Sequence, residues 1–166
     1  MENRELKLKD IAGYLPYGLK RRCENEKSQT FGKIIDFNMI NADFHIYKQH
    51  KPILRPLSDL YIPITHNGKD IIPILELAKI AFPHIPDWVL KGKKAIYNSQ
   101  YGNIEFYFDD KSFKAYRHDE GFLPCINQYQ LFDYLNELKF DYRQLCEKGL
   151  AIPVYDLDKN PYEVEI

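Results

Sequence analysis

Histidine and carboxylate side chains are the first candidates for chemistry in this chain, because together they can hold a metal ion. His45 and His50 lie five positions apart, and the other histidines are scattered along the chain. The segments 118–120 (His-Asp-Glu) and 109–110 (Asp-Asp) would bring hard oxygen ligands to one end of a predicted hairpin. Exposed turns favour the same residue types, and no cysteine pair has the spacing of a structural zinc site. We therefore predict no metal site.

The three cysteines, Cys23, Cys125 and Cys146, are the candidate nucleophiles. Their odd number and wide spacing favour reduced thiols in a cytosolic setting. Cys146 lies on the apolar face of a predicted helix, where a free cysteine is commonly buried. Cys125 directly precedes a helix start, which can lower a thiol pKa, but no histidine lies near it in the sequence. We predict no catalytic residue at these positions.

Motifs for cofactor chemistry are also missing from the sequence. The chain has no phosphate loop, no dinucleotide fingerprint and no nucleophile elbow. We therefore expect a protein that is not an enzyme and that uses no cofactor.

Two basic clusters are the candidates for nucleic-acid binding. Lys20, Arg21 and Arg22 lie on a predicted strand, on which the first and third side chains share a face. The second cluster sets an aromatic ring beside cations, an arrangement that can stack a base. Its members are Trp88, Lys91, Lys93 and Lys94. Because the formal net charge is −1, whereas nucleic-acid-binding domains are usually basic, we keep this function as the alternative.

Aromatic content is the unusual feature of the composition, with 13 Tyr and 10 Phe against one Trp. Such chains are typical of β-sheets and of surfaces on which one edge of a ring stays in water. Tyrosine is also enriched where proteins meet partners, so we expect another protein as the partner. The tyrosines that cannot all be in the core are Tyr14, Tyr17, Tyr97, Tyr101, Tyr107 and Tyr116.

A C-terminal helical hairpin gives the strongest secondary-structure signal. Asn127 and Gln130 have the spacing of a capping box, and apolar residues at helical spacing follow as far as Leu138. A second box over 141–144 predicts another short helix, which Gly149 ends in a left-handed conformation.

The N-terminal part predicts a helix followed by short strands. The helix covers 6–15 and ends at Pro16. One further predicted strand, 150–154 near the C-terminus, must lie at a sheet edge because Pro153 cannot donate to a central ladder. The other predicted strands are 19–23, 31–37, 44–47 and 53–55.

The middle of the chain predicts a helix over 73–82 and a β-hairpin over 95–117, joined by a loop at 83–94. The fold class is therefore α+β, with short antiparallel strands and a β-hairpin packed against the C-terminal helical hairpin.

A chain of 166 residues is expected to form one domain, 1–166. If it has two lobes, these are the sub-lobes 1–82 and 95–166, joined by the loop 83–94. The most apolar run, 71–82, is interrupted by charged residues and is too short to cross a bilayer. With no signal peptide at the N-terminus, we expect a cytoplasmic protein without membrane contact.

Three segments carry a resemblance: DIAGYLPYGLK near the start, KPILRPLSDL in the middle and LNELKFDYRQLCEKGLAI near the end. They resemble uncharacterised small phage- and prophage-associated proteins of Bacteroides-type bacteria. The resemblance covers about a quarter of the chain, implies an intracellular accessory protein, and provides no functional residue. Our first hypothesis is therefore a non-enzymatic phage or prophage accessory protein that binds another protein; the alternative is a nucleic-acid-associated protein that uses the basic clusters.

Overall fold

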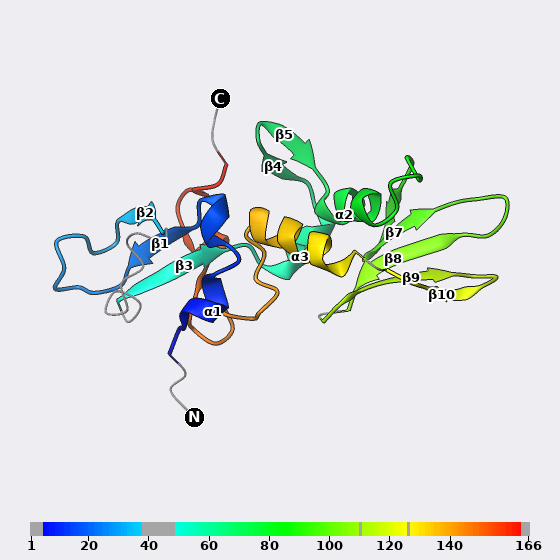
Figure 1. The fold of residues 1–166 in the computed structure, drawn as a ribbon. Helices are drawn as coiled ribbons and strands as arrows, with labels where there is room; N and C mark the ends of the chain where they lie inside the picture. The colour runs from blue at the N-terminus through cyan, green and yellow to red at the C-terminus, as the bar shows by residue number, and fades with distance from the viewer. Residues whose placement is uncertain (1–4, 38–48, 110, 126, 164–166) are drawn as a thin grey trace. The chain divides into compact units, whose positions relative to one another are not determined.

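The computed structural model describes residues 5–37, 49–109, 111–125 and 127–163, and the chain forms two compact units (Figure 1). Unit 1 comprises Met1–Leu57 and Leu135–Val164, and unit 2 comprises Ser58–Tyr134 and Glu165–Ile166. The predicted joint at 83–94 is therefore not the boundary, because this segment lies within unit 2 and contains part of its sheet.

Unit 1 contains a four-stranded sheet in the order β11-β3-β1-β2. Its strands are β1 (Lys20–Cys23), β2 (Ile34–Asp36), β3 (His50–Leu54) and β11 (Ile152–Pro153). β1 pairs antiparallel with β2 and β3, whereas β11 lies parallel to β3 at the edge, as Pro153 predicts. The predicted strand 44–47 lies outside the described residues.

The first core of unit 1 forms where the N-terminal segment packs on the C-terminal part of the chain. The predicted helix is shorter than expected: α1 (Leu8–Ile11) is followed by a 3-10 turn, η1 (Leu15–Tyr17), which includes Pro16 instead of ending before it. Tyr14 is fully buried, and its hydroxyl donates to the carbonyl of Phe140 at 2.8 Å. The side chains of this core include Ile11, Tyr14, Leu19, Phe37, Leu54 and Leu145.

The C-terminal segment of the chain begins with α3 (Gln128–Glu137), directly after Asn127 as predicted. The segment that follows is a series of turns and not the predicted second helix, because Gln144 has a left-handed φ of 57°. The carboxylate of Asp141 accepts the backbone N–H of Leu145 at 2.7 Å and of Cys146 at 2.8 Å. Gly149 has a φ of 68°, so the predicted left-handed end is confirmed.

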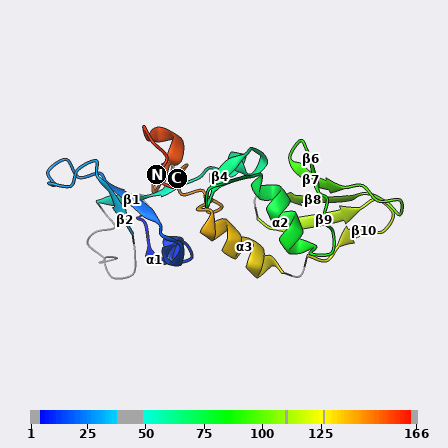
Figure 2. The same cartoon turned by 90° about the horizontal axis from the view of Figure 1, so that it is seen from above.

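Unit 2 is built on a five-stranded antiparallel sheet in the order β10-β9-β8-β7-β6, whose strands lie side by side in Figure 2. The strands are β6 (Val89–Lys91), β7 (Lys94–Tyr97), β8 (Ile104–Phe108), β9 (Phe113–Arg117) and β10 (Gly121–Leu123). The predicted hairpin over 95–117 is confirmed. The short strand β6 replaces part of the predicted loop 83–94, and β10 lies in a segment for which no strand was predicted.

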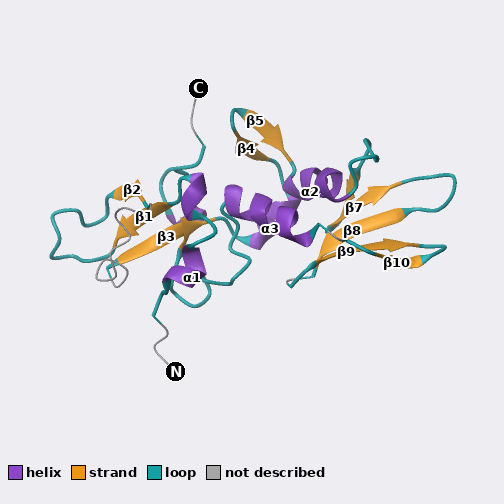
Figure 3. Ribbon diagram, viewed as in Figure 1, coloured by secondary structure: helices purple, strands orange, loops and turns teal. Residues whose placement is uncertain are grey.

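The helices of unit 2 cover the apolar, inner face of this sheet. α2 (Pro73–Ala81) packs against β6 and β7, close to its predicted bounds (Figure 3). Phe106 stacks on Phe113 with ring centroids 5.6 Å apart, and Phe132 of α3 contacts Phe108 and Phe113 edge to face. The alternation of apolar and polar residues along β8 and β9 is the reason for this one-sided core.

The remaining elements of unit 2 are a single 3-10 turn and a small hairpin. η2 (Leu57–Tyr61) precedes β4 (Ile64–His66) and β5 (Lys69–Ile71). Asn67 and Gly68 have φ of 51° and 72°, as a tight hairpin turn requires. The α+β class predicted from the sequence is confirmed. In the described part of the chain, every helix is too short or too polar to cross a bilayer.

Candidate functional site: the outer face of the five-stranded sheet

The face of the five-stranded sheet opposite the helices carries a row of side chains that runs from one edge strand to the other. Val89 pairs with Ile96, Ile96 with Glu105, Glu105 with Tyr116, and Tyr116 with Phe122. Cross-strand partners project to the same face, so these five residues form one outer row. Val89 is 57% exposed and Phe122 is 70% exposed, so both ends of the outer row are open to solvent.

A second row, the lysine row, lies beside the outer row on the same face. It consists of Lys91 and Lys94, which pair across β6 and β7, and of Tyr107 and Lys114, which pair across β8 and β9. The ammonium group of Lys94 lies 5.3 Å from the centre of the Tyr107 ring and links the two pairs.

Carboxylates neutralise most of the charge of the lysine row. Lys94 donates to Glu105 at 2.5 Å, and Lys114 forms an ion pair with Asp109. His118 Nε2 lies 3.2 Å from the other oxygen of Glu105. The hydrogen bond from Lys94 lowers the pKa of Glu105, with a further contribution from His118, against the opposing effect of burial. Glu105 is therefore ionised at neutral pH, and the charges of this face largely cancel.

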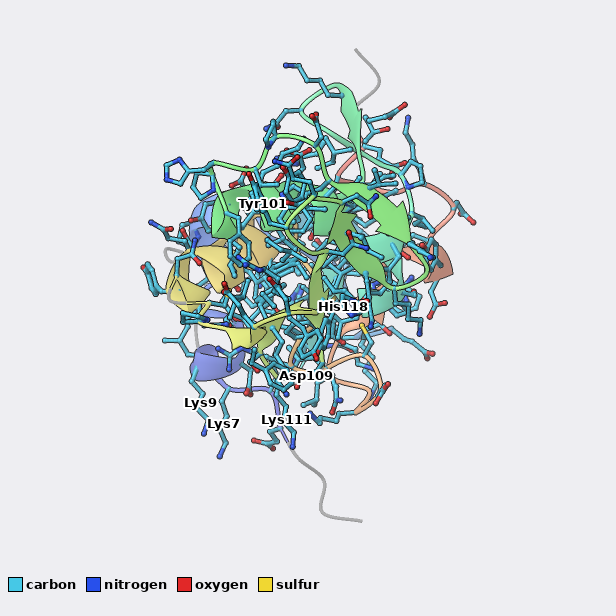
Figure 4. The ribbon with its side chains drawn as sticks, turned by 90° about the vertical axis from the view of Figure 1, so that its right-hand side faces the viewer. Lys7, Lys9, Tyr101, Asp109, Lys111 and His118 are labelled. Atoms are coloured by element: carbon cyan, nitrogen blue, oxygen red, sulfur yellow. The ribbon has the colours of Figure 1, made fainter. Side chains whose placement is uncertain are left out.

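The β10 end of the outer row is an aromatic corner. The ring of Tyr116 packs edge to face on Phe122 at 5.4 Å and on His118 at 5.5 Å. Figure 4 looks at the end of the sheet that carries the β7–β8 and β9–β10 turns, where Tyr101 and His118 are labelled. Phe122 is thus an exposed ring on an edge strand that packs against the ring of Tyr116.

A pocket of about 320 Å³ lies where β10 ends beside β9. There the side-chain amide of Gln128 takes the place of a strand: its Oε1 accepts the N–H of Phe113 at 3.0 Å, and its Nε2 donates to the carbonyl of Phe113 at 2.6 Å. The residues that line the pocket are Phe113, Lys114, Ala115, Phe122, Leu123, Cys125 and Gln128.

The Cys125 thiol in this pocket is not prepared for nucleophilic chemistry. Burial raises its pKa, so the thiol stays protonated at neutral pH. Its neighbour within reach is the amide oxygen of Asn127 at 3.8 Å, which is not a base. The pocket is therefore suited to hold an apolar group.

The first predicted basic cluster lies on β1 of unit 1, and its three residues have different environments. Lys20 donates to Asp36 at 2.5 Å, and Arg22 donates to Glu24 at 2.7 Å. Arg21 is buried on the opposite face of the strand, 4.9 Å above the ring of Phe37. The predicted alternation of faces is observed, but the three cations do not form one surface.

The second cluster lies in unit 2, and the structure separates its ring from its cations. Trp88 is only 6% exposed and packs on the inner face against Phe82 and Phe106, so it cannot stack a base. The sequence interpretation failed here because it treated the segment as a loop, whereas β6 extends its alternation to position 88. Lys91 and Lys93 are exposed, and Lys94 belongs to the lysine row.

The sequence pointed to two residues of the outer face only as members of a larger set of tyrosines that cannot all be in the core. Tyr107 and Tyr116 were among the expected surface tyrosines, but Tyr14 is a core residue. Phe122 and Val89 were missed, because a strand of three residues is too short to show a period. Of the residues weighed as metal ligands, His45 and Asp110 lie outside the described residues. In the described segments, no group of three or more His, Cys, Asp or Glu residues could hold an ion.

Comparisons with known proteins give no further assignment. No protein-family model, no curated protein and no solved structure matches this chain.

Proposed function

We propose that this chain is a non-enzymatic interaction protein that binds another protein through the outer face of the five-stranded sheet. The observation that carries the proposal is the exposed Phe122 on edge strand β10, at the end of the outer row. An exposed aromatic ring beside an apolar pocket is typical of an anchor at a protein interface. Burying such a ring contributes about 1.5–3 kcal/mol, which makes Phe122 the expected hot spot.

The edge position of β10 favours a partner that presents an extended segment. Its free backbone groups can extend the sheet by one strand, which supplies main-chain hydrogen bonds. A partner residue placed next to Phe122 would then reach the pocket beside Cys125 and Gln128. The partner we propose is therefore a protein strand with an apolar side chain directed toward this pocket.

The cellular setting is part of the same proposal. The three cysteines are free thiols, which fits the reducing cytoplasm. The resemblance of three segments to phage and prophage proteins supports an accessory role in a mobile element. In this role the chain would bind a host or phage protein.

Nucleic-acid binding on the same face is the second candidate, because the lysine row combines Lys91, Lys94 and Lys114 with the ring of Tyr107. Single-stranded nucleic acid binds to such combinations of cations and aromatic rings. The ion pairs of Lys94 with Glu105 and of Lys114 with Asp109 weaken this candidate, since they cancel the charge that phosphate groups would need.

A capture experiment with matched variants tests the proposal. The protein is immobilised as wild type, as Phe122→Ser and as Tyr129→Ser; Tyr129 is the control, an exposed aromatic ring on α3 that is 82% exposed. We expect a partner protein from the natural host cells to be retained by the wild type and by Tyr129→Ser, and to be lost with Phe122→Ser. Equal retention by all three proteins, or retention of nucleic acid alone, overturns the proposal.

A further inference from the structure

Unit 1 buries the guanidinium of an arginine with little to neutralise it. Arg55 follows β3 and is 3% exposed. Among the described residues, its side chain makes one hydrogen bond, a long one of 3.4 Å to Oε1 of Glu163. A guanidinium has five N–H donors, and a buried charge is costly unless it is paired. Arg55 therefore has donors left for an anion.

Lys139 brings a second cation to the same place. The backbone fixes the two residues against each other, because the N–H of Arg55 donates to the carbonyl of Lys139 at 2.8 Å. Lys139 also has a left-handed φ of 61°, a conformation that non-glycine residues rarely adopt. The pKa of the Lys139 amine is lowered to about 8, chiefly by burial, with smaller contributions from Arg55 and Lys20 and against the opposing effect of Glu137.

The ring of Tyr162 contacts both cationic side chains, and its hydroxyl contacts the sheet. Lys139 Nζ is 5.2 Å from the ring centre, and Arg55 Cζ is 5.9 Å from it. The hydroxyl of Tyr162 donates to the carbonyl of Ile53 at 2.7 Å and accepts the backbone N–H of Lys20 at 3.0 Å. The ring is thereby fixed to β1 and β3, and both cations lie over it.

Among the described residues, Glu163 supplies the one carboxylate that contacts Arg55. Its Oε1 also accepts a hydrogen bond from Asn160 at 2.9 Å, and its side chain is 45% exposed. A single, partly solvated carboxylate at 3.4 Å does not satisfy the five donors of Arg55. It occupies the place that a better anionic ligand would take.

We propose that Arg55, Lys139 and Tyr162 form a binding site for a phosphate group, and that the Glu163 carboxylate occupies this site as an internal competitor. Arginine binds phosphate oxygens in a two-pronged geometry, and lysine adds a point charge. The ligand is inorganic phosphate or the monoester of a small molecule. The site is independent of the outer face of unit 2, because its three residues belong to unit 1.

Phosphate titrations at constant ionic strength test the site, with heteronuclear NMR shifts as the readout. The variants are Glu163→Gln, which removes the competitor, and Lys139→Met, which removes one cation. Lys9→Met is the matched control, because Lys9 is an exposed lysine of unit 1, labelled in Figure 4. We expect saturable binding that is several-fold tighter in Glu163→Gln and about tenfold weaker in Lys139→Met, with Lys9→Met unchanged.

Two further measurements separate binding from loss of structure and identify the source of the phosphate. Bound phosphate must raise the pKa of Lys139 in the wild type, because a neighbouring anion favours the charged amine. A sugar monophosphate that binds more tightly than inorganic phosphate identifies a monoester as the ligand, and the reverse order identifies the free ion. The proposal is overturned by the absence of saturable binding, by equal affinities in Glu163→Gln and wild type, or by equal affinities in Lys139→Met and Lys9→Met.

Discussion

Asp109 illustrates at the scale of a residue how a turn side chain becomes an acid-sensitive contact. Its Oδ1 accepts the backbone N–H of Lys111 at 3.3 Å and of Ser112 at 3.0 Å, while its other oxygen pairs with Lys114. The hydrogen bond from Lys114, followed by that from Ser112, lowers the pKa of Asp109 to about 2 from 3.8. The carboxylate that the sequence placed among candidate metal ligands therefore belongs to the turn.

The first prediction follows from the sign of this shift. A pKa that is depressed in the folded state contributes stability above the unfolded pKa, and this contribution is lost as the pH falls. Asp109→Asn should therefore be destabilising near neutral pH, and the difference from wild type should shrink between about pH 4 and pH 2. Chemical denaturation over this pH range measures the difference. A difference that does not change with pH would contradict the assignment.

The second prediction compares two glycines with positive φ. Gly149 has φ of 68° and open space around the position of a Cβ, so Gly149→Ala should cost only the left-handed strain, about 1 kcal/mol. Gly102 has φ of 121°, and a Cβ there would lie 2.7 Å from Oδ1 of Asp119. That carboxylate is held by Arg117 at 2.7 Å and 2.9 Å and cannot move away freely.

Gly102→Ala should therefore cost more than Gly149→Ala, within about 1–3 kcal/mol for a conformation that is nearly restricted to glycine. Unfolding free energies from urea titrations compare the two variants directly. Gly102 lies in the β7–β8 turn and Asp119 in the β9–β10 turn. A larger loss of stability in Gly149→Ala than in Gly102→Ala would contradict the close approach of these two turns.

At the scale of elements, the sequence predicted a strand or helix correctly where its pattern of apolar and polar residues was long enough to recognise. β8 and β9 alternate over five residues each, and the helix α2 has a clear apolar face, so these elements were predicted correctly. β6 and β10 have three residues each and depend on pairing with their neighbours, which a local pattern does not contain. The stretch 141–149 fails as a helix because Asp141 binds the amides beyond the left-handed Gln144.

The third prediction concerns the junction between β9 and α3. Gln128→Glu keeps an oxygen for the N–H of Phe113 but loses the donor to its carbonyl and places a charge beside that oxygen. We expect a loss of about 1–3 kcal/mol in the free energy of unfolding and faster amide hydrogen exchange at Phe113. Gln130→Glu is the matched control, because Gln130 is exposed on the same helix. Equal losses of stability in Gln128→Glu and Gln130→Glu would show that the hydrogen bonds between Gln128 and the backbone of Phe113 do not stabilise the sheet.

At the scale of the whole molecule, the sequence predicted the class but not the division of the chain. The near-neutral composition suggested that no single charged surface dominates, and the ion pairs on the outer face are consistent with this. The boundary between the units was placed wrongly because proline and glycine in 83–94 resemble a linker, although this segment contains β6. Exposure of Phe122 depends on the pairing of β10 with β9, so no local pattern could reveal it.

The affinity for the captured partner, measured by calorimetry at low and at physiological salt, tests the central claim most directly. An interface centred on Phe122 should bind with little dependence on salt, because its binding energy comes from apolar burial and main-chain hydrogen bonds. The account predicts similar affinities at both salt concentrations, a loss of about tenfold or more in Phe122→Ser, and no loss in Tyr129→Ser. An affinity that falls steeply with salt, drops in Lys91→Glu and is unchanged in Phe122→Ser would contradict it.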